Sequence, residues 1–477
     1  MLENTTLFLI INTLSGTGYS LISPLLPILG KKQNLSEGIL GWMIGIYPIA
    51  GCTLTTVVPF LSKKFTRIKL LSFGTFFEAV IVILYSLLIF ISNKTLLIVI
   101  IFSLRIFHGC CSAIIAILVY SLTIAFAKEG RTQGSLGKLE VAWAVGVSSG
   151  PLVASVFYKI GGYPLPFLVT GVCSFLSFYL SFQINDKKNK KDNDEEEDDD
   201  NYNYLKYLIH PEIFSVLIGL VVGMINVTFY YPCLTYHLIN NYLVSVSIVS
   251  LFFITPIIPY MVILQFLDRL SAKLGIYLTF TFGFIFLGIS SIFIYPVPPL
   301  PKSIIITVIG FLMLGVGSVP VFIPGLVMLS ENIKKIDNSI DDMSANDIAS
   351  AINNLCLELG DFIGPILGGY LTDNFGFKLC CSFVSAIGII YSAIFILFFY
   401  GKIKKDFKMV CCNKKSQRNE DINERELEEI NEDDYFKKIK ANILMNKYSV
   451  RLSSSSFKGY RKNNNKERNW LCSTLTN

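Results

Sequence analysis

The sequence predicts an all-α membrane protein with twelve transmembrane helices in two pseudo-symmetric six-helix bundles. Hydrophobic residues make up 52% of the 477 residues, charged residues make up 16%, and the mean hydropathy is +0.55. A soluble chain carries about 25% charged residues. Long apolar runs alternate with short polar joints, and about 20 apolar residues are enough for a helix to cross a bilayer. The runs lack the alternation of strands, and backbone groups in lipid must be satisfied internally, so the spans are predicted to be helices.

Glycine, proline and charged residues divide the apolar runs into two sets of six predicted spans. The first set covers residues 5–29, 38–61, 70–91, 95–124, 135–158 and 163–184. The second covers residues 211–234, 244–267, 274–296, 302–329, 346–371 and 376–400.

Lysine and arginine residues in the joints predict the orientation in the membrane. If both termini are cytoplasmic, the inner joints hold 19 of these residues and the outer joints hold 6. This excess follows the positive-inside rule, so both termini are expected in the cytoplasm. The start of the chain, MLENTTLFLIINTL, lacks the features of a signal peptide and is expected to lead into the first span. A vesicle or vacuole membrane and the plasma membrane both remain open.

Charge patterning divides the chain into four parts. The bundles are expected at 1–184 and 211–400, joined by an acidic cytoplasmic linker at 185–210 that contains KKNKKDNDEEEDDDN. Residues 401–477 are polar and are expected to form a disordered cytoplasmic tail. Within this tail, Cys411 and Cys412 are either a palmitoylation site or two unmodified thiols.

Composition argues against several other classes of protein. The net charge of +6 comes from joints and tail, so it does not indicate nucleic-acid binding. Three histidines and the absence of paired CxxC spacing argue against a zinc site. No G-x-x-x-x-G-K loop and no nucleophile–base pair stands out, so neither a pump driven by ATP nor an enzyme is predicted. No cofactor and no metal are expected.

An internal repeat connects the two halves. GVSSGPLVAS places Gly146, Gly150 and Pro151 in the fifth span, and GDFIGPILGG places Gly360, Gly364 and Pro365 in the eleventh. Each residue of the second set follows its counterpart by 214 residues. Such six-plus-six repeats are typical of secondary transporters. The second copy continues with the pair Gly368 and Gly369.

Two carboxylates stand beside the second copy of this motif, at Glu358 and Asp361. A charged side chain at mid-bilayer costs about 2.5–3.5 kcal/mol, so both are expected to face protein or a water-filled cavity. Three residues apart, they share one helical face. Burial and mutual repulsion disfavour the doubly ionised pair, so the two should titrate as a unit and could carry a proton. The alternative is that Glu358 only forms a structural hydrogen bond near a membrane face.

Four further ionisable residues inside predicted spans are candidates for a role in transport or packing. Glu140, at the start of the fifth span, is a candidate proton carrier, whereas Glu78 in the third span is as readily a packing residue. Arg105 is either a side chain that reaches the interface or a partner for a carboxylate. His108 is either a hydrogen-bonded core residue or a proton relay.

The seventh span offers candidate substrate-binding groups in GMINVTFYYPCLTYHL. Amides, phenols and aromatic faces, with carboxylates in reach, suit an organic cation. The alternative is that these aromatic residues simply pack or line the membrane interface. The candidate substrate residues are Asn226, Tyr230, Tyr231, Asn354 and Ser15.

These motifs resemble those of the major facilitator superfamily, and within it the drug:proton antiporter branch. The paired G-x-x-x-G-P motif is similar to the antiporter motif of that branch, although Ala154 and Ser155 stand where the first copy would have Gly-Gly. SLRIFHGCCSA is similar to its R-x-x-Q-G pattern, with His108 in place of Gln. The resemblance implies that Arg105 tunes a neighbouring carboxylate, for which Glu140 is the candidate. PFLSKKFTRIKL matches the loop signature after span two only in outline, because Lys63 replaces its Asp.

GSLGKLEVAWAVGVSSGP and LMLGVGSVPVFIPGLVMLSEN resemble the vesicular amine transporter family, in particular its polyamine-transporting relatives. Those relatives carry L-G-x-x-E before the fifth-span motif, which Gly137 and Glu140 match. The first span has Asn12 and Ser15 where monoamine members have an Asp. The resemblance implies proton-coupled antiport of a small organic amine or polyamine by a chain that works as a monomer. Transport of another small metabolite, and a scaffold or receptor that transports nothing, are the alternatives.

Overall fold

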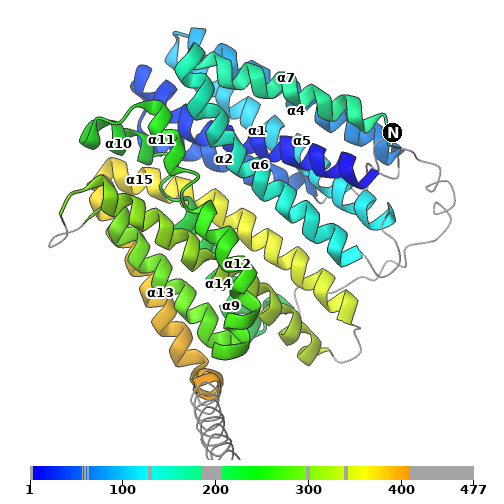
Figure 1. Cartoon of the computed structure of the whole chain (residues 1–477), viewed down its shortest axis with the longest axis vertical. Coiled ribbons are helices and arrows are strands. Elements are labelled where there is room, and N and C mark those ends of the chain that lie inside the picture. Colours follow the sequence, from blue (N-terminus) through cyan, green and yellow to red (C-terminus); the bar gives the residue numbers. More distant parts are fainter. Residues whose placement is uncertain are drawn as a thin grey trace, which may run out of the picture. The chain divides into compact units, whose positions relative to one another are not determined.

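The computed structural model describes residues 4–55, 57, 58, 61, 64–126, 132–184, 207–296, 301–337 and 342–407 (Figure 1). All of them belong to one unit, Met1–Val410. The Cys411–Cys412 pair, Lys63 and most of the predicted linker lie outside the described residues.

In the part of the chain that the structure describes, six helices build the first bundle, coloured from blue to teal in Figure 1. They are α1 (Asn4–Lys32), α2 (Glu37–Thr55), α4 (Arg67–Leu87), α5 (Lys94–Phe126), α6 (Thr132–Gly161) and α7 (Pro164–Ser181), with a 3-10 turn η1 (Leu88–Phe90) after α4. They match the first six predicted spans in order. Where α1 begins and ends defines the two ends of the molecule, called here the Asn4 end and the Lys32 end.

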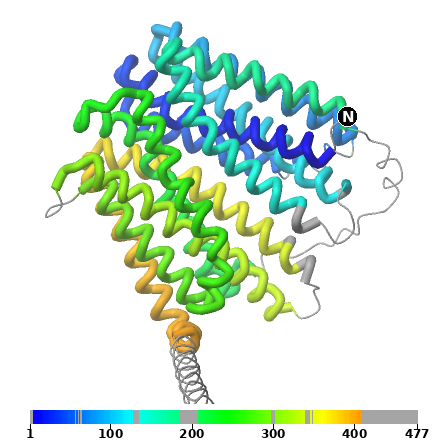
Figure 2. Tube along the Cα trace, in the orientation of Figure 1, coloured from blue at the N-terminus to red at the C-terminus, as the bar shows by residue number. Residues whose placement is uncertain are grey.

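Seven helices of the described residues build the second bundle, coloured from green to orange in Figure 2. They are α9 (Pro211–Thr228), α10 (Leu234–Tyr242), α11 (Val246–Phe252), α12 (Ile257–Leu274), α13 (Ile276–Ile294), α14 (Ile304–Ile336) and α15 (Asp342–Phe398). The predicted seventh and eighth spans are each interrupted, because Pro232 and Pro256 lack the N–H that would continue the helix. The last two spans form α15 and are separated by a kink at Gly376, whose φ is 80°.

The predicted fold class is confirmed for the described residues, which are helical and include no strand. Within the described ranges, ten helical segments are long and apolar enough to cross a membrane. One of these, Ile348–Phe398, contains both of the predicted spans that flank Gly376. The remaining predicted span is α1, whose buried face is rich in serine, threonine and glycine. The protein is therefore an integral, multi-pass membrane protein.

The repeated motif makes the same kind of contact in both bundles. Gly150 of α6 lies against the Ser20 hydroxyl of α1, and Gly364 of α15 lies against the Thr228 hydroxyl at the end of α9. Ser20 and Thr228 are 208 residues apart, so the contacted helices repeat as well as the motif. Any side chain at either glycine would collide with the neighbouring helix. The motif thus fastens the fifth span to the first, and the eleventh to the seventh.

Each bundle has its own apolar core. The buried residues of the largest cluster all lie between Tyr207 and Ile403, and those of the two other clusters lie between Leu7 and Ile184. Among the described residues, contact between the apolar cores is limited to partly buried side chains of the second bundle, Tyr231, Tyr236 and Val246, which pack against a cluster of the first.

A glycine seam joins the bundles toward the Lys32 end. Gly41 and Gly45 of α2 lie against backbone carbonyls of α15, and Gly369 of α15 lies against the Glu37 carbonyl. Asp373 of α15 accepts hydrogen bonds from the backbone N–H groups of Glu37 and Gly38, at 2.9 and 2.8 Å. Its carboxylate thus caps the N-terminus of a helix in the other bundle, where the helix dipole favours negative charge. The two bundles are closely joined at this end.

The segment after α15 differs from the prediction of a disordered tail starting at residue 401. Residues 401–407 are helical. Lys402 forms a 2.7 Å ion pair with Glu212 at the start of α9, and Asp406 accepts hydrogen bonds from the backbone N–H groups of Tyr277 and Leu278. These polar contacts hold the segment against the Asn4 end, and composition alone did not reveal them.

Candidate functional site

A hydrogen bond joins the bundles at the centre of the molecule. The Tyr19 hydroxyl of α1 donates to Asp361 Oδ2 of α15 over 2.8 Å. Asp361 is 7% exposed, so its carboxylate meets protein rather than lipid. Of the sequence-predicted acidic residues, Asp361 is the one placed at the contact between the halves. A bond from a neutral donor to an ionised group contributes about 1.5–3 kcal/mol, enough to help hold the two bundles together at this point.

Aromatic side chains surround this hydrogen bond. The Tyr19 ring lies 5.0 Å from the Tyr47 ring and 5.8 Å from the Trp143 ring, measured between centroids. Tyr231, just after α9, lies within electrostatic range of both Tyr19 and Asp361. The rings come from α1, α2, α6 and the break after α9, so both bundles contribute to one aromatic and acidic site.

Glu358 lies about one turn before Asp361 on α15, and its side chain is exposed. It is within electrostatic range of Asp361 and also of Tyr47 and Cys52 on α2. Because the Glu358 carboxylate is exposed and lies within electrostatic range of the other bundle, it borders the space between the bundles. The predicted pairing of Glu358 with Asp361 is therefore present, with one member exposed and the other buried. Asn354, one turn further toward the Asn4 end, is also exposed.

Arg105 is buried beneath the aromatic site. It is 1% exposed, donates from Nε to the Met43 carbonyl over 3.0 Å and from Nη2 to the Ile44 carbonyl over 2.7 Å, and lies 4.6 Å from the Tyr47 ring centre. The interpretation of Arg105 as a side chain reaching the interface is therefore wrong. Asp361 lies within its electrostatic range, so the cation faces a carboxylate of the opposite bundle.

Glu140 is not the partner of Arg105. Its exposed carboxylate accepts a 2.6 Å hydrogen bond from the Tyr120 hydroxyl of α5 and lies within electrostatic range of Tyr260 on α12. The resemblance placed a carboxylate beside the arginine, but α6 carries Glu140 at the level of Asn12, whose amide donates to the Leu139 carbonyl. Glu140 therefore borders the space between the bundles nearer the Asn4 end.

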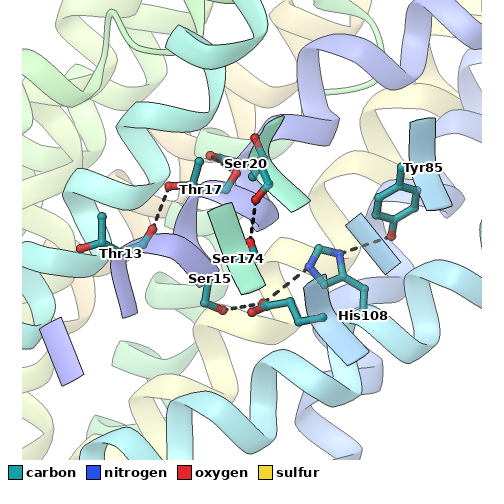
Figure 3. A network of polar contacts seen from close by, with 9 residues as sticks. Thr13, Ser15, Thr17, Ser20, Tyr85, His108 and Ser174 are labelled. Atoms are coloured by element: carbon teal, nitrogen blue, oxygen red, sulfur yellow. Dashed lines mark hydrogen bonds and ion pairs between the residues drawn. The ribbon is translucent and has the colours of Figure 1, made fainter. Parts of the chain in front are cut away.

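A second polar cluster lies wholly inside the first bundle. Figure 3 shows the contacts that run from Tyr85 through His108 toward Ser15. Ser15 donates a 2.6 Å hydrogen bond to Glu78 Oε1, so this predicted substrate residue instead serves a buried carboxylate. Glu78 and His108 are 2% and 0% exposed. Sequence reasoning left Glu78 undecided, because a span's apolar composition does not tell which face of it turns inward.

Two predicted substrate residues do not reach the central site. Asn226 is fully buried, donates to the Val222 carbonyl of its own helix, and has its amide oxygen near Gly388 inside the second bundle. Tyr230 is 1% exposed and packs against Phe253 and Phe311. For both, the packing alternative describes the observed position. The adjacent Tyr231 also contacts Tyr230 and Phe253, with ring centroids 5.0 and 5.8 Å apart, but it additionally lies within electrostatic range of Asp361.

Two bundles of six spans that meet at a buried polar site define a membrane transporter by fold and by site. Residues 8–340 match the Major Facilitator Superfamily, and the chain belongs to this superfamily. Its members are membrane transporters and not enzymes, so the protein is a transporter of small-molecule substrates.

Sequence relatives extend over most of the chain. MFS-type transporter SLC18B1 of Homo sapiens is 24% identical over 375 residues, which are 76% of this chain and 78% of the relative. The Mus musculus protein of the same name is 23% identical over 396 residues, 80% of this chain and 82% of the relative. The expected likeness to the vesicular amine transporter family is thereby confirmed.

Solved structures agree in fold. A bacterial homolog of the human lysosomal transporter Spinster, in an inward-facing and occupied conformation, has a TM-score of 0.67 and 11% identity, covering 82% of this chain and 95% of that one. The nucleoside transporter NupG has a TM-score of 0.63 and 12% identity, covering 83% and 99%. At such identities the likeness concerns the fold alone.

Proposed function

We propose that this chain is a proton-coupled antiporter that moves a small organic amine or a polyamine by alternating access. The observation that carries the proposal is the Tyr19–Asp361 hydrogen bond, which puts a buried carboxylate where the two bundles meet. A carboxylate there can hold either a proton or the ammonium group of a substrate. Because the two ligands compete for one negative charge, they would cross the membrane in opposite directions.

The surroundings of Asp361 favour a cation as substrate. The faces of Tyr19, Tyr47 and Tyr231 attract an ammonium group by about 0.5–2 kcal/mol each. Exposed Glu358 and Glu140 would add negative charge along the approach from the Asn4 end. The cation of Arg105 is held beneath Tyr47 by two backbone carbonyls, which separates it from this approach.

Alternating access would be a rocking of the bundles, 1–184 against 211–400, with residues 185–210 as the cytoplasmic connection. The extensive contacts between bundles, α2 with α15 and α6 with α11, lie toward the Lys32 end. The lysine and arginine distribution supports the Asn4 end as the cytoplasmic one. On this assignment the structure corresponds to a state closed outside, with Glu358 accessible from the cytoplasm.

Uptake into proteoliposomes tests the proposal. Labelled spermidine and labelled serotonin are offered with and without an imposed pH gradient to the wild type, Glu358→Gln and Asp361→Asn. The wild type should accumulate at least one amine only with the gradient, and Asp361→Asn should lose that accumulation. Glu331→Gln is the matched control, because its exposed carboxylate pairs only loosely with Lys335, at 3.9 Å. Amine uptake in Asp361→Asn equal to wild type under the gradient would overturn the proton-carrier role.

A further inference from the structure

A carboxylate and an imidazole face each other inside the first bundle, away from the contact between the bundles. Glu78 Oε1 of α4 lies 3.7 Å from His108 Nε2 of α5, and both side chains are buried. A buried carboxylate costs several kcal/mol unless it is paired or protonated. Two such groups, from different helices and without contact to lipid, need an explanation beyond packing.

Each member of the pair has a hydrogen-bond partner outside the pair, but no hydrogen bond joins Glu78 to His108. Tyr85 OH contacts His108 Nδ1 at 3.3 Å, and Ser15 donates to Glu78 Oε1 at 2.6 Å. Among the described residues His108 Nε2 has no hydrogen-bond partner, and it faces the Glu78 carboxylate. A distance of 3.7 Å is slightly too long for a hydrogen bond. A small shift of either side chain would place a proton between the two atoms.

Few other charges act on this pair. The ionisable groups that face it are Arg105 of α5, Tyr47 of α2, Tyr85 of α4 and Cys111 of α5. Of these, only Arg105 carries a charge at neutral pH. Asp361 of the opposite bundle lies within range of the same guanidinium. One fixed cation therefore stands between two acidic sites, one inside a bundle and one between bundles.

We propose that Glu78 and His108 form a second proton-binding site, coupled electrostatically to Asp361 through Arg105. Uptake of one proton creates an N–H or O–H bond between Oε1 and Nε2, breaks no bond, and changes the charge of the pair from −1 to 0. When Asp361 is neutralised by a proton or an amine, Arg105 compensates Glu78, and the pair can release its proton. When Asp361 is ionised, it competes for the guanidinium, and the pair holds its proton. The coupling to transport rests on the proposed antiport.

Infrared difference spectroscopy tests proton binding without any assumption about transport. Full-length protein in detergent is titrated over about pH 5 to 8, the range in which histidine side chains change charge. Acidification should change the bands of the Glu78 carboxyl group, giving a C=O band where the proton lies on Oε1 and a shifted carboxylate band where it lies on Nε2. This change should be missing in Glu78→Gln and should move its midpoint in His108→Gln. Glu78→Asp, which keeps a carboxylate, should retain a shifted band and serves if Glu78→Gln fails to fold. Spectra of Glu78→Gln that superimpose on those of the wild type would overturn the proposal.

Transport assays then separate this inference from the proposed function. Glu78→Gln should lose accumulation of labelled spermidine or serotonin driven by a pH gradient but retain counterflow, which needs no net proton movement. Glu331→Gln is again the control. If Glu78→Gln accumulates like the wild type while Asp361→Asn does not, antiport stands and the second site is refuted. If accumulation and counterflow fall by the same factor in Glu78→Gln, the residue is structural and the coupling is refuted.

Discussion

The two copies of the G-x-x-x-G-P motif differ in what surrounds them. In α6, Gly146 and Gly150 pack against α1 of the same bundle, and the motif continues with Ala154 and Ser155. In α15, the equivalent glycines pack against α9, but the motif also carries Asp361 and continues with Gly369 against α2 of the other bundle. The glycines of the first copy contact only their own bundle, whereas the second copy contacts its own bundle and also the opposite one, through Asp361 and Gly369.

The different surroundings of the two motif copies show how two repeated halves can differ in the residues that lie between the bundles. Helix packing needs only small residues at matched positions, so both copies keep them. A carboxylate in a membrane is costly and is kept where it is used. The second copy is therefore the place where substitutions should separate transport from folding.

The largest effects are expected where the copies are alike. Gly150→Leu and Gly364→Leu each drive a side chain into a facing helix, at the Ser20 and Thr228 hydroxyls. Overpacking costs about 1–3 kcal/mol, and more where backbone must move. Both variants should lose most folded protein in fluorescence size-exclusion chromatography, and to similar extents. Gly401→Leu, at a site with open space, is the control. A strong loss of folded protein in only one of the two variants would show that the two copies of the motif do not contribute equally to packing.

A smaller and more selective effect is expected where the copies differ. Gly369→Leu would collide with the Glu37 carbonyl and hold the bundles apart at the Lys32 end, whereas the matching Ser155→Leu leaves the seam intact. Thiol labelling of an introduced cysteine at Gly38 should rise in Gly369→Leu, and amine uptake should fall by at least about tenfold, the factor given by 1.4 kcal/mol. Unchanged labelling would show that the seam does not control closure.

The hydrogen bond between the bundles gives a further test. Tyr19→Phe removes the donor to Asp361, while Tyr47→Phe removes the hydroxyl of the neighbouring ring and leaves the Tyr19–Asp361 bond in place. Loss of about 1.5 kcal/mol predicts roughly tenfold weaker gradient-driven amine uptake for Tyr19→Phe. The Tyr47 variant should stay close to wild type. Equal losses in both would point to the aromatic ring rather than to the hydrogen bond.

The smallest effect concerns the Asn4 end of the second bundle. Burial lowers the pKa of Lys402, but hydrogen bonds to Glu212 and Tyr277 outweigh it, so the pKa is raised. Its stabilisation is therefore complete below the ordinary lysine pKa of about 10.4 and is lost as the pH rises through the folded-state value. Lys402→Gln should lower thermal stability at neutral pH by at most about 1 kcal/mol, because the pair is partly exposed. The difference from wild type in a melting assay should vanish at strongly alkaline pH, and a difference that grows there would contradict this.

Local patterns were sufficient to predict much of the chain. The twelve spans, the repeat and the position of Glu358 and Asp361 on one helix follow from apolar run length and from residue spacing. The breaks near Pro232 and Pro256 had a visible cause but were not predicted, because prolines also occur inside α1, α2 and α14 without ending them.

The partners of the polar residues could not be predicted in the same way. Arg105 was expected beside Glu140, yet it bonds to backbone carbonyls of α2, and Ser15 was expected to meet substrate, yet it meets Glu78. Asn226 and Tyr231 are only five residues apart, but Asn226 lies in the packed interior of the second bundle and Tyr231 lies near the central site. The rotation of a helix about its axis and the position of its breaks decide which way a side chain points. Neither can be read from the composition of a span.

A helical membrane protein of two related halves could be predicted from the amino acids alone, because the cost of exposing polar groups to lipid acts on every residue of a span. Which polar groups meet became apparent only in the folded molecule, because a hydrogen bond between helices depends on their relative rotation and depth. The Tyr19–Asp361 bond joins residues 342 positions apart, a proximity that no local pattern encodes.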